Sequence, residues 1–215
     1  MNEDEIGIVF GEAVEAYRKL PSSITVASAI FSLTGHKVIP LEDGNPDDKA
    51  LIDQIRIAAD HCMRSLETDP IVSKRVNEVG NLFEPRLKNS CEQIGMRAEW
   101  PAGGRSGYPD LLVFDAANRP TYVEIKTVGP GQEGTTFRSF YLSPSENSKV
   151  RMDARHLLVA FAHKSGAVAE GLTSYSATAF KIVDLSGVCG NIKFEYQSSN
   201  KRLYGKDQVV ASGAL

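Results

Sequence analysis

Apolar residues recur every three or four positions along residues 2–69, which is the spacing of helices that bury one face. In the stretch DEIGIVFGEAVEAYRKL the apolar stripe consists of Ile6, Phe10, Val14 and Tyr17, and Pro21 is expected to end this helix. The next apolar stretch, SSITVASAIFSLTG, is either a short helix or a buried strand. We favour a helix, because Gly35 follows it and glycine is common just after a helix ends.

A longer helix is expected to begin at Pro46. Asn45 is suited to the N-cap, proline is favoured at the first helical position, and two aspartates follow in the first turn, where the helix dipole favours anions. Another helix is expected over residues 69–95. Pro85 either kinks it or splits it into two shorter helices that meet near Glu84. Its apolar stripe consists of Val76, Val79, Phe83, Leu87 and Ile94.

After residue 95 the pattern changes to short runs rich in β-branched and aromatic residues, which predict strands. These runs are MRAEW, DLLVFDA, TYVEIKTV, TFRSFYL, HLLVAFAHK and SATAFKIVDL, with a helical turn or short helix expected over 151–155. The fold class is therefore α/β. We expect a helical region at 1–70, a core at 71–190, and a weak strand with a polar tail at 191–215, all within one compact domain.

Composition narrows the class of protein without identifying it. The chain has 215 residues, 42% of them hydrophobic, and a net charge of −3, so no global basic charge points to nucleic acid. No apolar run reaches the roughly 18 to 20 residues of a spanning helix, and the N-terminus is acidic where a signal peptide is basic. Cys62, Cys91 and Cys189 form no C-x-x-C pair. We therefore expect a cytoplasmic protein that binds no membrane, with buried thiols in a reducing compartment.

Three charged residues stand in segments that otherwise read as apolar strands. DLLVFD and TYVEIKT are joined by the short loop AANRP, so they are expected to form an antiparallel hairpin. Glu124 and Lys126 then share one face, Ile125 points into the core, and Asp110 lies beside them at the open end. Because buried charges need partners, we expect a divalent cation here, and carboxylate oxygens suit Mg²⁺. Lys126 beside this metal is placed to orient a water and to stabilise charge developing on a phosphate.

The pattern Pro109-Asp110 … Glu124-Ile125-Lys126 resembles the signature of the PD-(D/E)XK nuclease superfamily, whose fold is called restriction-endonuclease-like. The resemblance implies a mixed central β-sheet flanked by helices, here with an additional N-terminal helical subdomain. It also implies that Asp110, Glu124 and the carbonyl of Ile125 bind Mg²⁺, which Mn²⁺ can replace, and that Lys126 orients the attacking water. Fourteen residues separate Asp110 from Glu124, which is typical of such a hairpin.

Members of the superfamily often carry a glutamate on the helix before the first of these strands, and Glu84 matches it. On a helix, Glu84 lies at the border of the apolar stripe, whereas Glu78 points to the opposite side. The segment TTFRSFYLSPSENSKVRMDARHLLVAFAHK resembles the region after the catalytic lysine in several type II restriction endonucleases. This resemblance implies a homodimer that cuts double-stranded DNA at a specific site, with a companion DNA methyltransferase encoded nearby.

Side chains suited to phosphate and base edges gather around the expected site, although solvated surface positions are the alternative explanation for them. The expected DNA contacts are Arg105, Arg138, Tyr141, Ser143, Asn147, Lys149, Arg151 and Arg155. Two other functions stay open. One is a repair, recombination or mobile-element nuclease with the same core. The other is a non-catalytic DNA-binding protein that retains the fold.

Overall fold

The computed structural model describes residues 2–75, 78–103, 107–130, 140, 142, 147–168, 171–193, 207 and 209–211. The chain divides into two compact units, Met1–Ile24 with Gly190–Leu215, and Thr25–Cys189. The second unit therefore includes helices that the sequence suggested grouping with the N-terminal region. Two short strands, β1 (Ile24–Thr25) and β8 (Cys189–Gly190), span the two points at which the chain passes from one unit to the other.

The smaller unit contains α1 (Glu3–Arg18), which confirms the first predicted helix. The side chain of Asn2 accepts a hydrogen bond from the Glu5 N–H, and the Glu5 carboxylate accepts one from the Asn2 N–H, so the helix begins in a reciprocal capping box. The helix ends before Pro21, and none of its side chains is buried.

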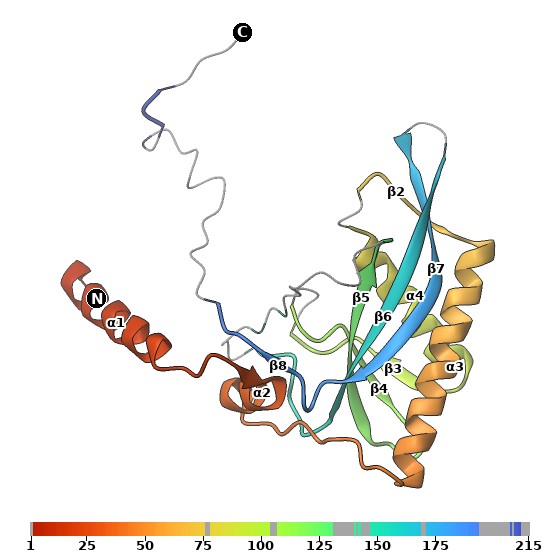
Figure 1. The fold of residues 1–215 in the computed structure, drawn as a ribbon, viewed down its shortest axis with the longest axis horizontal. Coiled ribbons are helices and arrows are strands. Elements are labelled where there is room, and N and C mark those ends of the chain that lie inside the picture. The colour runs from red at the N-terminus through yellow and green to blue at the C-terminus, as the bar shows by residue number, and fades with distance from the viewer. Residues whose placement is uncertain are drawn as a thin grey trace. The chain divides into compact units, whose positions relative to one another are not determined.

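Six strands of the larger unit form one mixed sheet in the order β2-β7-β6-β5-β4-β3. Figure 1 shows these strands twisting and curling across the sheet. Strands β5 and β6 run parallel, and all other neighbours are antiparallel. A mixed central sheet with flanking helices confirms the predicted fold class. The strands are β2 (Ile71–Ser73), β3 (Arg97–Glu99), β4 (Leu111–Phe114), β5 (Pro120–Val128), β6 (Arg155–Ala167) and β7 (Thr173–Asp184).

The described residues of this unit form the helices α2 (Val26–Thr34), α3 (Pro46–Thr68) and α4 (Val79–Gln93). The Asn45 side chain accepts hydrogen bonds from the first-turn N–H groups, as the sequence predicted for the start of α3. Gly35 follows α2 at φ 74°, which confirms the helix and explains the glycine, since most other residues avoid that conformation. Among the helices of the described residues, none is both long and apolar enough to cross a membrane.

Two segments differ from the sequence prediction. Residues 71–73 form strand β2 at the sheet edge and not helix. The physical reason lies in Asp69, because Pro70 disfavours the helical conformation of the residue before it and so ends α3. Residues 151–155 contain no helix, because Ala154 pairs with Val38 and the Arg151 N–H donates to the Tyr122 hydroxyl.

Other expectations about the elements have mixed outcomes. Helix α4 is continuous with Pro85 inside it, so the alternative of two helices is wrong. The strand expected over 136–142 lies mostly outside the described residues, and Phe140 and Leu142 are not in a strand. The tail expected beyond 193 is also largely outside them. Cys62 and Cys91 are buried as expected, and burial raises the pKa of each thiol to about 12, but Cys189 is exposed.

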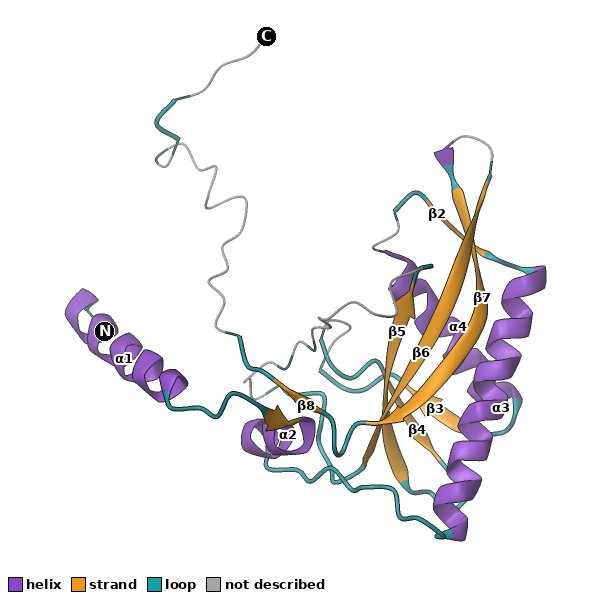
Figure 2. Cartoon of the chain, viewed as in Figure 1, coloured by secondary structure: helices purple, strands orange, loops and turns teal. Residues whose placement is uncertain are grey.

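The core has two parts, one on each face of the sheet. Figure 2 shows α3 and α4 beside the sheet, and their apolar faces pack on one side of it. Ile30 of α2 packs on the opposite side together with Leu112 and Tyr122. Ile125 belongs to the α3 and α4 side, so strand alternation sends Glu124 and Lys126 to the other face, as the sequence predicted.

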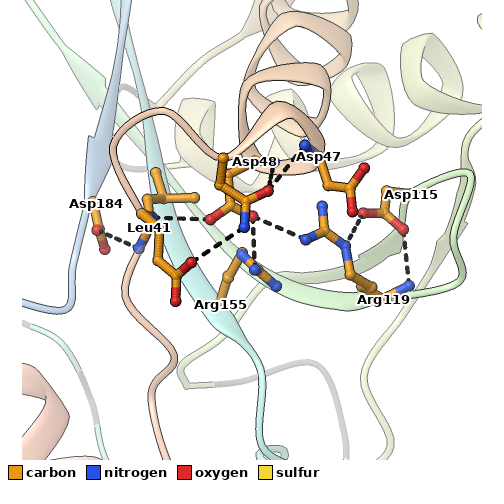
Figure 3. A network of polar contacts seen from close by, with 9 residues as sticks. Leu41, Asp47, Asp48, Asp115, Arg119, Arg155 and Asp184 are labelled. Carbon is orange, nitrogen blue, oxygen red and sulfur yellow. Dashed lines mark hydrogen bonds and ion pairs between the residues drawn. The ribbon is translucent and has the colours of Figure 1, made fainter.

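A buried ion network holds the turn between β4 and β5 against the start of α3 (Figure 3). Asp48 accepts hydrogen bonds from the Arg119 guanidinium and from the Glu42 N–H, both at 2.9 Å, and it forms an ion pair with the Arg155 guanidinium at 2.6 Å. Arg119 also donates to Asp115 at 2.6 Å. Burial alone would raise the pKa of Asp48, but the Glu42 N–H and the two guanidiniums outweigh it and lower that pKa.

Candidate active site

The candidate site lies at the open end of the β4–β5 hairpin, away from the turn. Leu111 pairs with Val123, which confirms the predicted antiparallel hairpin. Asp110 directly precedes β4, and its N–H donates to the Val123 carbonyl at 3.1 Å. Its Oδ2 accepts a hydrogen bond from the Ile125 N–H at 2.7 Å. The carboxylate of Asp110 is thus fixed against the backbone of β5, beside Glu124.

Glu124 and Lys126 lie on one face of β5, two residues apart, and the Lys126 ammonium donates to Glu124 Oε1. The Glu124 side chain is only 4% exposed, whereas that of Lys126 is 26% exposed. The ring of Phe140 lies 5.6 Å from the Lys126 ammonium. The structure therefore brings Asp110, Glu124 and Lys126 together, with the lysine more accessible than the glutamate.

The two carboxylates are not fully compensated by their surroundings. Burial raises the pKa of Asp110 despite the opposing effects of the Ile125 N–H and of the ammonium groups of Lys126 and Lys149. Burial, with a further contribution from the Asp110 charge, raises the pKa of Glu124 to about 7. Glu124 Oε2 is buried and has no hydrogen-bond partner among the described residues. This site would gain stability from a further positive charge.

The arrangement fits a divalent cation bound by oxygen. Asp110 has one carboxylate oxygen bonded to the Ile125 N–H, and Glu124 has one bonded to Lys126, so each carboxylate keeps a second oxygen that could act as a ligand. No group of three or more histidine, cysteine, aspartate or glutamate side chains in the described part of the chain is placed to hold a metal. A cation here would accordingly complete its shell with backbone carbonyl, water or substrate oxygens.

Glu84, on α4, is therefore not assembled with Asp110 and Glu124 into a three-carboxylate group. Its charge nevertheless acts on a nearby group of the site. Burial lowers the pKa of Lys149, while the charges of Asp110, Glu84 and Glu124 oppose that effect. The charge of Glu84 thus acts on the same ammonium as the charges of the other two carboxylates.

The residues expected to contact DNA fall into three groups. Asn147 and Arg151 are exposed, which is compatible with such a contact. Lys149 and Arg155 are buried, and Arg155 pairs with Asp48 in the ion network, so their positions are at odds with a contact to DNA. Four residues lie outside the described part of the chain: Arg105, Arg138, Tyr141 and Ser143.

Sequence reasoning missed a buried polar pair beneath the site. The Tyr108 hydroxyl and His156 Nδ1 are 2.6 Å apart, and the two rings stack with centroids 5.8 Å apart. Burial lowers the pKa of His156 to about 4, so the imidazole is neutral near pH 7. Tyr108 precedes the Pro-Asp pair and His156 begins an apolar run. The two residues are 48 positions apart, and no sequence pattern indicates that they are in contact.

Fold and site together define a nuclease with the restriction-endonuclease-like core. Comparison with known proteins gives the same class. A family model described as the type II restriction enzyme MjaV family matches residues 21–207. The chain is 33% identical over 207 residues to the type II restriction enzyme MjaV of Methanocaldococcus jannaschii, covering 87% of each chain. The chain belongs to the type II restriction enzyme MjaV family.

This membership confirms the enzyme class that the motif resemblance implied, which is a type II restriction endonuclease. It disfavours the non-catalytic alternative. The matched residues 21–207 include the whole hairpin and Glu84, whereas α1 lies outside them.

Proposed function

We propose that this protein cuts double-stranded DNA at a specific short sequence in a reaction that requires Mg²⁺, with Mn²⁺ as a substitute. The observation that carries the proposal is the convergence of Asp110, Glu124 and Lys126 at the open end of one hairpin. A buried and a half-buried carboxylate, both with raised pKa values, support a site for a cation, and the buried one, Glu124, has an oxygen that lacks a partner among the described residues.

Asp110 and Glu124, with the carbonyl of Ile125, would hold the Mg²⁺. When bound, the cation supplies positive charge that stabilises the negative charge developing on the phosphate and on the departing oxygen. The chain contributes by fixing the ligands: the Ile125 N–H holds one oxygen of Asp110, and Lys126 holds one oxygen of Glu124.

Lys126 would orient the attacking water. Its ammonium has three N–H donors, one of which is used on Glu124, and its partial exposure leaves the others accessible to substrate and solvent. The oxygen of this water would attack phosphorus in line with the 3′ oxygen while the water releases one proton to solvent. The bond between phosphorus and the 3′ oxygen would break, and the 3′ oxygen would take up one proton from solvent. The products are a 5′-phosphate and a 3′-hydroxyl. Glu84 would act through its effect on Lys149.

We further propose a homodimer, because a two-fold symmetric enzyme matches the two strands of a palindromic site. A companion methyltransferase would protect the host's own copies of the site. Sedimentation of the purified protein with and without DNA tests the dimer.

A plasmid digest tests the central proposal. Incubation with Mg²⁺ should give discrete fragments, chelation by EDTA should stop cleavage, and Mn²⁺ should restore it. Asp110→Ala and Lys126→Ala should abolish cleavage while DNA binding persists. Smears or nicks confined to branched DNA would favour the repair or recombination alternative, and equal behaviour of wild type and variants would favour the non-catalytic one.

A further inference from the structure

Lys149 is a buried lysine whose ammonium binds the backbone of one short segment. The residue is 6% exposed, and its ammonium donates to the carbonyl of Gly107 at 2.6 Å and to the carbonyl of Pro109 at 2.8 Å. These two carbonyls belong to the residues on either side of Tyr108, and Pro109 immediately precedes Asp110. The ammonium therefore ties down the backbone that carries the first predicted metal ligand.

The backbone next to Lys149 is itself anchored to the sheet. Val150 is buried in the core part that contains Tyr122, and the Arg151 N–H donates to the Tyr122 hydroxyl at 2.9 Å. Tyr122 is on β5, two residues before Glu124. Lys149 thus connects the strand that carries Glu124 to the segment that carries Asp110.

The loop before this segment also closes on Lys149. Gly103 has φ 110°, and a Cβ at this position would lie 2.7 Å from the Asn147 carbonyl oxygen and 3.5 Å from Lys149 Cγ. Only glycine permits this approach, because any larger residue would push the backbone of Asn147 away. The backbone is consequently held on both sides of Lys149, at Asn147 by Gly103 and at Arg151 by Tyr122.

The charge of Lys149 faces the acidic groups of the site. Asp110, Glu84 and Glu124 all act electrostatically on its ammonium. A lysine in this position offsets part of the repulsion between the carboxylates from within the protein. A neutral side chain of the same length would fill the space but provide neither the tether nor the charge.

We propose that Lys149 is a positioning residue of this nuclease: its ammonium, bonded to the Gly107 and Pro109 carbonyls, holds Asp110 in the orientation that cleavage requires. This inference rests on the proposed role of Asp110 and Glu124. It replaces the expectation, drawn from sequence, that Lys149 contacts DNA.

The test compares Lys149→Met with wild type on a DNA fragment that the wild-type protein cuts. Methionine retains an unbranched apolar stem but has no donor and no charge. The single-turnover cleavage rate should fall by at least about 100-fold, because small misplacement of a reacting group has that effect. DNA affinity, measured by fluorescence anisotropy without divalent cation, should stay within about threefold, since the buried ammonium makes no phosphate contact.

The salt dependence of DNA binding separates the two roles of Lys149. A positioning residue leaves the slope of affinity against salt unchanged, whereas loss of a phosphate contact lowers that slope by about one. Lys49→Met, at an exposed position on α3, is the matched control and should cleave at the wild-type rate.

Lys149→Arg provides a second variant in case the methionine protein does not fold. It retains the charge, but a planar guanidinium cannot reproduce an ammonium between two carbonyls, so the rate should fall by at least about tenfold. Either variant, folded by circular dichroism and cleaving at the wild-type rate, overturns the inference. Asp110→Asn run in parallel shows which proposal has failed: if that variant also cleaves normally, the proposed function is wrong, and if it is inactive, only the role of Lys149 is wrong.

Discussion

Carboxylates lie near both ends of the β4–β5 hairpin, but their pKa values shift in opposite directions. At the turn, Asp48 accepts hydrogen bonds from the Arg119 guanidinium and a backbone N–H and pairs with the Arg155 guanidinium, and its pKa is lowered. At the open end, the pKa values of Asp110 and Glu124 are raised. Cations are present at both ends, so the difference lies in the balance of charge. At the turn two guanidiniums and an N–H act on Asp48, whereas at the open end the charge of Asp110 adds to the effect of burial on Glu124 and outweighs the ammonium groups of Lys126 and Lys149.

The polar atoms that lack partners among the described residues differ in the same way. At the turn they include two N–H donors, Arg119 Nη2 and Arg155 Nε, whereas at the open end they include a carboxylate oxygen, Glu124 Oε2. Of these two ends, the open one is therefore suited to receive a cation. We infer that the network at the turn stabilises the fold, while the open end retains uncompensated negative charge that a metal and substrate can use.

The largest expected effect of a single change at the open end is on catalysis. Asp110→Asn keeps the shape of the side chain but removes its charge, so the single-turnover cleavage rate should fall by at least about 1,000-fold. The free energy of unfolding should not decrease, because one of two repelling carboxylates is removed. Asp53→Asn, at an exposed position on α3, is the control. A rate within tenfold of wild type would contradict the catalytic assignment.

The corresponding change at the turn should affect stability and not catalysis. Asp48→Asn leaves the Arg155 guanidinium buried without its carboxylate partner, and the free energy of unfolding should fall by about 3 kcal/mol. Urea denaturation measures this loss. The folded fraction should cleave DNA at the wild-type rate, and a selective loss of activity would show that the two ends are functionally linked.

A smaller effect concerns pH. Glu124 binds its proton more tightly in the folded than in the unfolded protein, so metal-free stability falls as pH rises from its usual pKa of 4.5 to about 7. His156, with its lowered pKa, acts in the opposite direction between about 4 and 6.5. The lowered pKa of Asp48 matters only at more acidic pH, because its contribution is lost as pH falls through that value.

Comparison with Glu124→Gln isolates the glutamate from these other groups. Urea denaturation of both proteins from pH 5 to pH 8 should show the variant gaining stability over wild type as pH rises. If the difference in free energy of unfolding between the two proteins stays constant across that range, another group compensates the charge of Glu124 in the folded protein.

Sequence patterning predicted the hairpin, the start of α3 and the meeting of Asp110, Glu124 and Lys126, because those features depend on local spacing. Strand alternation alone sets which face Glu124 occupies, and a two-residue interval fixes Lys126 beside it. The same reasoning wrongly predicts a helix at residues 71–73, because short apolar runs suit either structure and Pro70 disfavours the helical conformation of Asp69.

The features that sequence patterning did not predict depend on contacts between distant segments. Lys149 is 40 residues from Pro109, and nothing in its neighbours distinguishes a buried tether from a surface lysine. Arg155 was likewise expected to meet DNA, but its guanidinium crosses to Asp48 at the start of α3. These two cations are buried by tertiary packing, and the spacing of apolar residues along one sequence does not predict such packing.

The smallest expected effect belongs to an exposed cation near the open end, Arg151. Its guanidinium donates to the Ser148 carbonyl at 3.2 Å, and its exposure leaves further N–H donors accessible. Arg151→Ala should weaken DNA binding by about threefold to tenfold and lower its salt slope by about one, as loss of one phosphate contact does. Fluorescence anisotropy across salt concentrations measures both. An unchanged salt slope would place Arg151 outside the DNA interface. If Arg151→Ala lowers the slope and Lys149→Met does not, the exposed cation contacts DNA and the buried one positions the site.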